Sequence, residues 1–402
     1  MQDLGTGDEV EGSSKAKCRI RSAPPDRSLP ENQVRSHHPA PGSPVFGLAC
    51  LPMTEPVLDT RTLNRALLAR QLLLERSKLS IPRAVERIGG LQAQYAPSAY
   101  IGLWSRLERF QRPQLTRSLE KARVIQATLM RVTIHIVSAA DYPVLTEAVR
   151  RSRQEWWSRV AKGRTLDHSG YDRVNALIRD ALADGPRPRS ELIQVLVDNG
   201  FAKDTWEGVG LWVDMVRVPP SGTWERRRAD LYGLAHQWVP LTEVTEVDAL
   251  QHLVKRYLGG FGPATVGDIS SWAGVPVSTL RPVIERMRLR SFRGTDDSHL
   301  IDLPRQPIPA AETTAPVRLL PTWDATLLIH ARRTQILPEE YRNQIFSTKN
   351  PQSLSPFLVD GVVAGIWKQA GAKVNLEPFA PLPRTARREL DGEAARLARF
   401  LA

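Results

Sequence analysis

The hydrophobic pattern of the chain predicts helices with short hairpins between them. Leucines at helical spacing follow Asp59 and Thr60, which can cap a first helix: Leu63, Leu67, Leu68, Leu72 and Leu74. Ser80 and Pro82 predict the start of a second helix, which ends at Gly89-Gly90. Helices near 98–107 and 114–122 follow, and the β-rich stretches VIQATLM and VTIHIVS then predict a hairpin that ends near Ala139. Three helices followed by a hairpin is the outline of a winged helix.

The same outline recurs twice further along the chain. Helices at 190–199 and 205–216 precede a turn at 219–222. A third copy begins with a helix at 248–258, which we expect Gly259-Gly260 to break. It continues with a helix-turn-helix around Gly274, formed by 265–272 and 278–287, and with strands near 288–293 and 299–303. The repeat is one of pattern and not of residue identity.

A Pro-rich link at 304–316 leads to a smaller unit. Asp360-Gly361 predicts a two-residue hairpin there, and an Arg-rich helix is expected at 384–401. The predicted fold class is mainly α with short β-hairpins (α+β). Three tandem winged-helix motifs at 56–140, 141–244 and 245–304 precede a C-terminal α/β unit at 305–402.

Residues 1–55 are rich in Pro, Gly, Ser and charge without periodicity, and we expect them to be disordered. Met53 lies just before the first helical pattern, so translation could begin there and leave the preceding residues out. Cys18 and Cys50 both lie in this leader, so the remaining chain offers no disulfide, thiolate nucleophile or zinc knuckle.

The net charge of +12 over 402 residues comes from residues 53–402, because the first 52 residues hold six basic and six acidic side chains. Arg supplies 45 of the 55 basic residues, and its planar fork suits phosphate, which favours nucleic acid as a partner. A GC-rich genome, which favours Arg codons, explains the same bias equally well. No apolar run approaches the roughly 18 residues that span a bilayer, and residues 1–20 lack a secretory signal, so we expect a cytoplasmic protein.

Familiar catalytic motifs are missing from the sequence. It contains no GxxxxGK[ST], GxGxxG, HExxH or GxSxG, and its eight His are scattered, so we expect neither a metal nor a cofactor. Trp104 and Trp212 lie at apolar helical spacing and are expected in the core, whereas Trp156-Trp157 beside several Arg could form either a nucleic-acid-binding face or a half-buried helix. Asp324 is expected to cap a helix.

Two amides in Gln92-Ala93-Gln94 form the most distinctive polar pair. Amides do not ionise, but each carries donor and acceptor groups that can hold a water molecule. Such a pair suits a reaction whose leaving group is already good. Taken alone, two Gln in a connection between helices are ordinary, and a structural role is the simpler interpretation.

One β-rich stretch alternates polar and apolar residues. Arg131, Thr133 and His135 share one face of the expected strand, opposite Val132, Ile134 and Ile136. The apolar face should be core, while the polar face would meet either a DNA groove and its lesion or only solvent.

Six segments occur in a specific order: GLQAQYAPSAYIGLWSRL, LMRVTIHIVSAADY, VPPSGTW, GGFGPATVGDISSWAGV, LLPTWDATLLIHARR and LVDGVVAGIW. From about Thr60 to Ala402 this succession resembles the bacterial winged-helix DNA glycosylases of the AlkZ/YcaQ type. The resemblance implies three winged helices around a basic concave channel and excision of alkylated purines, especially N7-alkylguanine and bulky or crosslinked adducts. Gln92 and Gln94 match the catalytic Gln-Φ-Gln motif of the AlkZ-like branch. Ala93 is smaller than the usual middle residue, and Val132 stands where Gly is expected.

The resemblance also implies how the site acts. The two Gln carbonyls would hold water at C1′ of a nucleotide whose alkylated base leaves as a neutral species, and without a Lys at the motif the enzyme would be monofunctional. The partner would be double-stranded DNA that carries alkylated bases. The protein would be a monomer associated with the nucleoid, and it would not bind a membrane. Residues expected to contact DNA are Arg131, Thr133, His135, Arg150, Arg151, Arg332 and Arg333. The alternatives are a non-enzymatic winged-helix DNA-binding protein, such as a transcription regulator, and a chromatin-binding protein that has lost activity.

Overall fold

The structure is a computed structural model that describes residues 55–402 except 162, 164–165, 329–333 and 347–352. The chain divides into two units, Met1–Thr54 and Glu55–Ala402, and every described residue belongs to the second. The predicted disordered leader therefore lies outside the described residues, apart from Glu55.

The first repeat follows helix α1 (Thr60–Arg70), which Asp59 caps through a hydrogen bond from the Thr62 amide. Its strands β2 (Leu91–Gln92) and β3 (Val124–Thr128) pair on either side of the central strand β4 (Ile134–Ser138). The order helix, strand, helix, helix, strand, strand, with the first strand paired to the last, is that of a winged helix. The elements are α2 (Ile81–Ile88), β2 (Leu91–Gln92), α3 (Ala96–Arg106), α4 (Arg112–Glu120), β3 (Val124–Thr128) and β4 (Ile134–Ser138).

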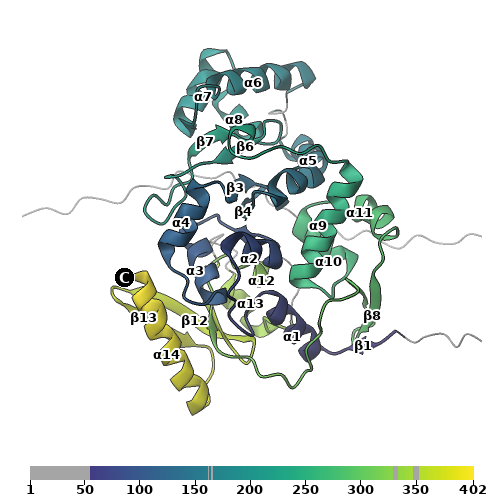
Figure 1. The fold of residues 1–402 in the computed structure, drawn as a ribbon, viewed down its shortest axis with the longest axis vertical. Helices are drawn as coiled ribbons and strands as arrows, with labels where there is room; N and C mark the ends of the chain where they lie inside the picture. Colours follow the sequence, from purple (N-terminus) through teal and green to yellow (C-terminus); the bar gives the residue numbers. More distant parts are fainter. Residues whose placement is uncertain (1–54, 162, 164–165, 329–333, 347–352) are drawn as a thin grey trace, which may run out of the picture. The chain divides into compact units, whose positions relative to one another are not determined.

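The same element order recurs in a second repeat and, without its first strand, in a third (Figure 1). Helix α5 (Asp141–Val160) leads to the second repeat. There β7 (Leu231–Leu234) pairs with both β5 (Arg187–Pro188) and β6 (Met215–Arg217). That repeat comprises α6 (His168–Ala181), β5 (Arg187–Pro188), α7 (Arg189–Asp198), α8 (Trp206–Val209), β6 (Met215–Arg217) and β7 (Leu231–Leu234). In the third repeat a single bridge, Ala264 to Ile301, takes the place of the first strand. The third repeat comprises α9 (Glu246–Phe261), α10 (Val266–Ala273), α11 (Val277–Ile284), β8 (Arg290–Gly294) and β9 (His299–Asp302).

The predicted α+β fold class of three winged-helix repeats is confirmed. The sheets of the first two repeats are continuous, because β3 pairs with β6 at Gln126 and Arg217, which gives the strand order β2-β4-β3-β6-β7-β5. One face of this sheet supplies Ile125 and Val137 to the core shared with α9, and the other supplies Leu91 and Ile136 to the core shared with α2 and α3. The strand β4 is therefore covered on both faces.

The C-terminal unit is an antiparallel sheet with the final helix against it. Its strands are β10 (Arg318–Leu319), β11 (Pro356–Val359), β12 (Val362–Ala370) and β13 (Lys373–Pro378), in that spatial order. Asp360 and Gly361 both have positive φ, as the predicted two-residue hairpin requires, and α14 (Arg384–Leu401) has the predicted bounds. The short helices α12 (Ala325–Leu328) and α13 (Arg342–Ile345) complete the unit, and β1 (Val57–Leu58) pairs with β8.

Two sequence predictions about helices were wrong. The stretch 205–216 contains the end of a 3-10 turn (Lys203–Thr205), the one-turn helix α8 and the start of strand β6. Trp212 lies after α8, stacked on Tyr171 at 3.8 Å between ring centroids. Gly208 is in contact with the indole of Trp157, where a Cβ would come within 2.9 Å. Gly259-Gly260 does not break α9, because Gly260 lets the helix approach Ile88 so closely that a Cβ would lie 2.9 Å from its carbonyl.

A buried ion pair joins the first repeat to the C-terminal unit. The Arg106 guanidinium donates to both oxygens of Asp324 at 2.9 Å, and Asp324 also accepts from the Thr326 amide at 3.0 Å, which caps α12 as predicted. Burial alone would raise the pKa of Asp324, but the charge and hydrogen bonds of Arg106 hold that pKa below its ordinary value. Asp324 is therefore a structural anion.

We expect Asp324→Ala to destabilise the protein by about 3–5 kcal/mol, because it leaves the Arg106 guanidinium buried without a counter-charge. Urea unfolding measures this, with Asp391→Ala, an exposed carboxylate on α14, as the matched control. Replacing both partners, in Arg106→Met with Asp324→Leu, should recover part of the loss. A loss below about 1 kcal/mol in Asp324→Ala would contradict the structural role.

Candidate active site

The two glutamines of the motif are attached to the same hairpin. Gln92 ends β2, is 8% exposed, and its Oε1 accepts a hydrogen bond of 2.8 Å from Nη2 of Arg131. Gln94 lies beyond the strand and is exposed, and its Oε1 accepts from the backbone amide of Ile134 at 3.0 Å. The Ala93 amide donates to the Ile134 carbonyl at 2.8 Å, so the backbone between the two amides is also fixed to β4.

These contacts determine which way each amide faces. Arg131 and the Ile134 amide can only donate, so the oxygen of each glutamine, and not its nitrogen, must face the hairpin. Each carbonyl oxygen keeps a second lone pair, and each NH₂ group keeps two donors. The small, buried Ala93 separates the two side chains. The pair can thus still hold a water molecule or a polar edge of a substrate.

Arg131 lies in the turn of the hairpin and not on a strand as the sequence suggested. It belongs to a 3-10 turn, Met130–Val132, with a φ of 52°. Besides Gln92, the guanidinium binds the backbone carbonyl of Trp272 at 2.5 Å, and a Cβ on Gly274 would come within 3.2 Å of the Arg131 amide. Burial lowers the pKa of Arg131 to about 10, so it stays charged at neutral pH. Arg131 therefore bridges Gln92 and the helix-turn-helix of the third repeat.

Val132 occupies the position where the resemblance predicts Gly, and its φ of 58° is left-handed. A β-branched residue is rarely found there, and the left-handed conformation costs an L-residue about 1–2 kcal/mol. The Val132 side chain packs against the cluster of Trp157, Tyr171 and Leu211. This packing offsets the conformational cost.

His135 is not on a solvent face, which corrects the prediction from alternation. It is 3% exposed, is in register with Gln92, and its Nδ1 lies 3.0 Å from the Thr133 carbonyl oxygen. Burial, followed by the positive charge of Arg131, lowers the pKa of His135 to about 3, so the ring is neutral. Thr133 is half-buried and donates from Oγ1 to the Met130 carbonyl at 3.0 Å. The alternation of polar and apolar residues led to a wrong prediction because β4 is a central strand covered on both faces.

The other residues predicted to contact DNA differ in how strongly carboxylates bind their charged groups. Arg150 is bound by Asp214 at 3.0 and 3.1 Å and by Glu147 at 2.9 Å. Burial lowers the pKa of Arg150, but the hydrogen bonds and charge of Asp214 outweigh burial and raise it. Arg151 is exposed and lies 3.1 Å from Glu155 and 3.7 Å from Glu246, so phosphate would have to compete with two carboxylates that are open to solvent. Arg332 and Arg333 lie outside the described residues.

Sequence reasoning missed the aromatic neighbour of the motif. Tyr95, directly after Gln94, is 42% exposed, and its hydroxyl accepts a hydrogen bond of 3.1 Å from Arg227. Arg227 belongs to the connection between β6 and β7, so the wing of the second repeat reaches the first repeat at the motif. The Arg226-Arg227-Arg228 run in that connection was the signal in the sequence. Trp156 is exposed on α5, whereas Trp157 is buried.

The described ranges contain no group of three or more His, Cys, Asp and Glu side chains able to hold a metal ion. In the same ranges, no helix has the length and apolar character needed to cross a membrane.

Comparison with known proteins identifies the class to which this chain belongs. The family model described as DNA glycosylase AlkZ-like matches residues 85–400, so the chain belongs to the AlkZ-like DNA glycosylase family. The predicted resemblance and enzyme class are thereby confirmed at the level of the family.

Individual proteins agree with this assignment. The interstrand DNA cross-link repair glycosylase of Streptomyces sahachiroi is 25% identical over 363 residues, which cover 82% of this chain and 93% of that protein. The solved structure of Streptomyces sahachiroi DNA glycosylase AlkZ matches with a TM-score of 0.74 at 19% identity, over 86% of this chain and 97% of that one. This structural match supports the fold.

The buried His135 predicts a pH dependence of stability. Between pH 6.5 and about 3 the unfolded chain binds a proton at this ring and the folded protein does not, so stability falls as the pH falls. From pH 7 to pH 5 the contribution is about 2 kcal/mol. In urea unfolding, the stability advantage of wild type over His135→Gln should shrink by this amount. An advantage that is constant with pH would contradict a buried, neutral ring.

Proposed function

We propose that the protein hydrolyses the N-glycosidic bond of alkylated purines in duplex DNA, with N7-alkylguanine as the substrate type and Gln92 and Gln94 as the residues that place the water. The observation that carries the proposal is that both amide oxygens are held on one hairpin by fixed donors, Arg131 and the Ile134 amide. Neither donor changes its charge near neutral pH, so the amides are oriented before substrate arrives.

The chemistry fits a site without a strong base. Alkylation at N7 gives guanine a positive charge, so the electron pair of the C1′–N9 bond leaves with the base, which becomes neutral. Water then bonds to C1′ of the oxocarbenium-like sugar and releases a proton to solvent. The free lone pairs on the two Gln oxygens can accept the hydrogens of this water, and their dipoles favour the cationic sugar. Neither Gln contacts a Lys within the described ranges, so an abasic site is the expected product.

The surroundings of the motif suit a DNA lesion. Tyr95 presents an exposed ring beside Gln94, and base stacking on such a ring contributes about 1–3 kcal/mol. Arg151, and on sequence grounds Arg332 and Arg333, would supply phosphate contacts. The relative named for interstrand cross-link repair favours bulky or crosslinked adducts as substrates here also. We propose a cytoplasmic monomer acting on DNA.

We expect Gln92→Ala and Gln94→Ala each to slow single-turnover excision of N7-methylguanine from duplex DNA by about 100-fold or more, the usual effect of removing a fixed polar group from a transition state. Alkaline cleavage of abasic sites measures excision, and fluorescence anisotropy measures binding. Gln194→Ala, an exposed Gln on α7, is the matched control. Tight binding by wild type with no strand breaks would contradict the glycosylase and favour a non-enzymatic DNA-binding protein.

Arg131 has two competing roles, and one pair of variants separates them. If it positions Gln92, Arg131→Lys should slow excision about tenfold with DNA affinity within twofold of wild type, because an ammonium keeps the charge but cannot span Gln92 Oε1 and the Trp272 carbonyl as the fork does. If it binds phosphate instead, Arg131→Lys should excise normally and Arg131→Met should reduce the salt dependence of binding.

A further inference from the structure

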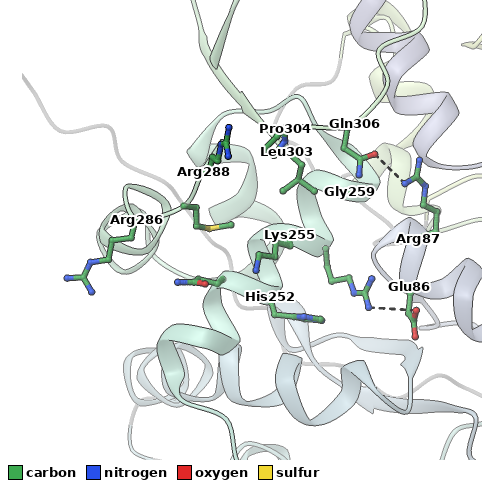
Figure 2. A pocket seen from close by; sticks show the side chains of 13 residues that line it. Glu86, Arg87, His252, Lys255, Gly259, Arg286, Arg288, Leu303, Pro304 and Gln306 are labelled. Carbon is green, nitrogen blue, oxygen red and sulfur yellow. Dashed lines mark hydrogen bonds and ion pairs between the residues drawn. The ribbon is translucent and has the colours of Figure 1, made fainter. Parts of the chain in front are cut away.

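A second basic site lies apart from the glutamines. It is a cavity of about 620 Å³ between α2, α9, the chain after α11 and the chain after β9 (Figure 2). Its charged lining consists of one carboxylate, Glu86, the imidazole of His252, and five cationic side chains: Arg87, Lys255, Arg256, Arg286 and Arg288. Such an excess of positive charge in a concave surface attracts anions.

Most of these cations have no counter-charge among the residues that the structure describes. Glu86 is bound by Arg83 at 3.0 Å and lies 3.8 Å from Arg256, whose main partner is Asp141 at 2.8 Å. The remaining cations form no ion pair with any residue that the structure describes: Arg87, Lys255, Arg286 and Arg288.

Among these cations, Arg87 has the least usual surroundings. It is half-buried, and its only hydrogen bond within the described residues runs 3.3 Å to the neutral Oε1 of Gln306, as Figure 2 shows. A half-buried guanidinium normally binds carboxylate or phosphate oxygens.

The cavity and the glutamines lie on opposite sides of α9. His252, Lys255, Arg256 and Gly259 share one face of this helix, and a Cβ on Gly259 would meet no atom within 4 Å, so the helix leaves the cavity open there. Tyr257 and Phe261 lie on the opposite face against Trp272, whose carbonyl holds Arg131. The cavity is therefore separate from the contacts that hold Gln92.

The basic surface extends beyond this cavity. A smaller cavity of about 400 Å³ shares Arg288, Leu303, Pro304 and Gln306 with it and adds Arg305. Cations thus follow one another along a path that is longer than a single small anion requires. A strand of phosphodiesters has that character, with one charge at each step.

We propose that this cavity binds backbone phosphates of a DNA segment away from the lesion. The inference rests on the duplex DNA partner in the proposed function. The phosphates would take the place of the missing counter-charges around Arg87, Lys255 and Arg288. Binding there would anchor the duplex at a second point without touching the glutamines.

The salt dependence of DNA binding tests this. Fluorescence anisotropy with a labelled duplex of about 25 base pairs gives the affinity of the whole protein between 50 and 200 mM KCl, a range over which phosphate contacts dominate. For Lys255→Gln with Arg288→Gln, the slope of log K against log salt should fall by about 1–2, with about 0.9 for each phosphate that the variant no longer neutralises. Arg387→Gln with Arg388→Gln, both exposed on α14, is the control and should keep the wild-type slope.

Other results would distinguish a failure of this second site from a failure of the proposed function. An unchanged slope in Lys255→Gln with Arg288→Gln, while wild type still excises N7-methylguanine in the same samples, overturns the second site and leaves the proposed function intact. A reduced slope with no excision by wild type supports the site and contradicts the glycosylase. Tripolyphosphate, added without DNA, tests for a free ligand: if it raises the melting temperature of wild type only and the slope is unchanged, the site takes a free polyphosphate and the strand assignment is wrong.

Discussion

The arrangement of the Gln92-Ala93-Gln94 motif depends on one side chain, the guanidinium of Arg131. Arg131 donates to the Gln92 amide in the first repeat and to the Trp272 carbonyl in the third, from the turn of the hairpin whose Ile134 amide holds Gln94. Three segments that are far apart in the sequence therefore meet at one side chain. Because the fork has fixed geometry, the position of the third repeat determines that of Gln92. The tandem repeats thus act as one scaffold for the two amides.

The first and third repeats approach one another closely at helix α9. Gly260 brings α9 against the Ile88 carbonyl, next to the Gly89-Gly90 turn that leads into Gln92. The pair of Arg70 with Asp302, with both side chains fully buried, adds a contact between α1 and β9. These close backbone approaches leave little room for the repeats to move separately.

Local signals in the sequence were enough for most elements. Asp59, Ser80 and Thr265 marked helix starts, Asp360-Gly361 marked a hairpin, and the winged-helix order followed from them. The errors arose where tertiary packing outweighed local preference. Gly260 lies where the Ile88 carbonyl approaches, and a sequence pattern does not distinguish such a glycine from a helix breaker. Over 205–216 the pattern predicted one continuous helix, and it did not reveal that Gly208 packs against the indole of Trp157.

The site was harder to predict than the fold. The glutamine pair stands out as a motif, but the alternation around His135 indicated a strand with one exposed face, because nothing local revealed that core side chains cover β4 on both faces. Tyr95 and Arg227 meet through a contact between residues 132 positions apart. The folded repeats determine which residues a side chain contacts, whereas the sequence of one segment shows only how its residues are spaced.

In the proposed reaction, the charge needed for catalysis would come from the substrate and not from the side chains of the site. His135 is neutral, Gln92 and Gln94 cannot ionise, and Arg131 stays charged, so none of these four groups changes its protonation state near neutral pH. A site of this kind cannot protonate an ordinary purine as it leaves, and it can only stabilise charge that the substrate already carries. The positive charge of Arg131 would repel a cationic sugar. The guanidinium binds one lone pair of the Gln92 oxygen, however, and this oxygen would separate it from a water molecule bound at the other lone pair. In the proposed reaction, selectivity for alkylated bases would follow from the lack of a proton donor among these four groups, and it need not depend on recognition of the alkyl group.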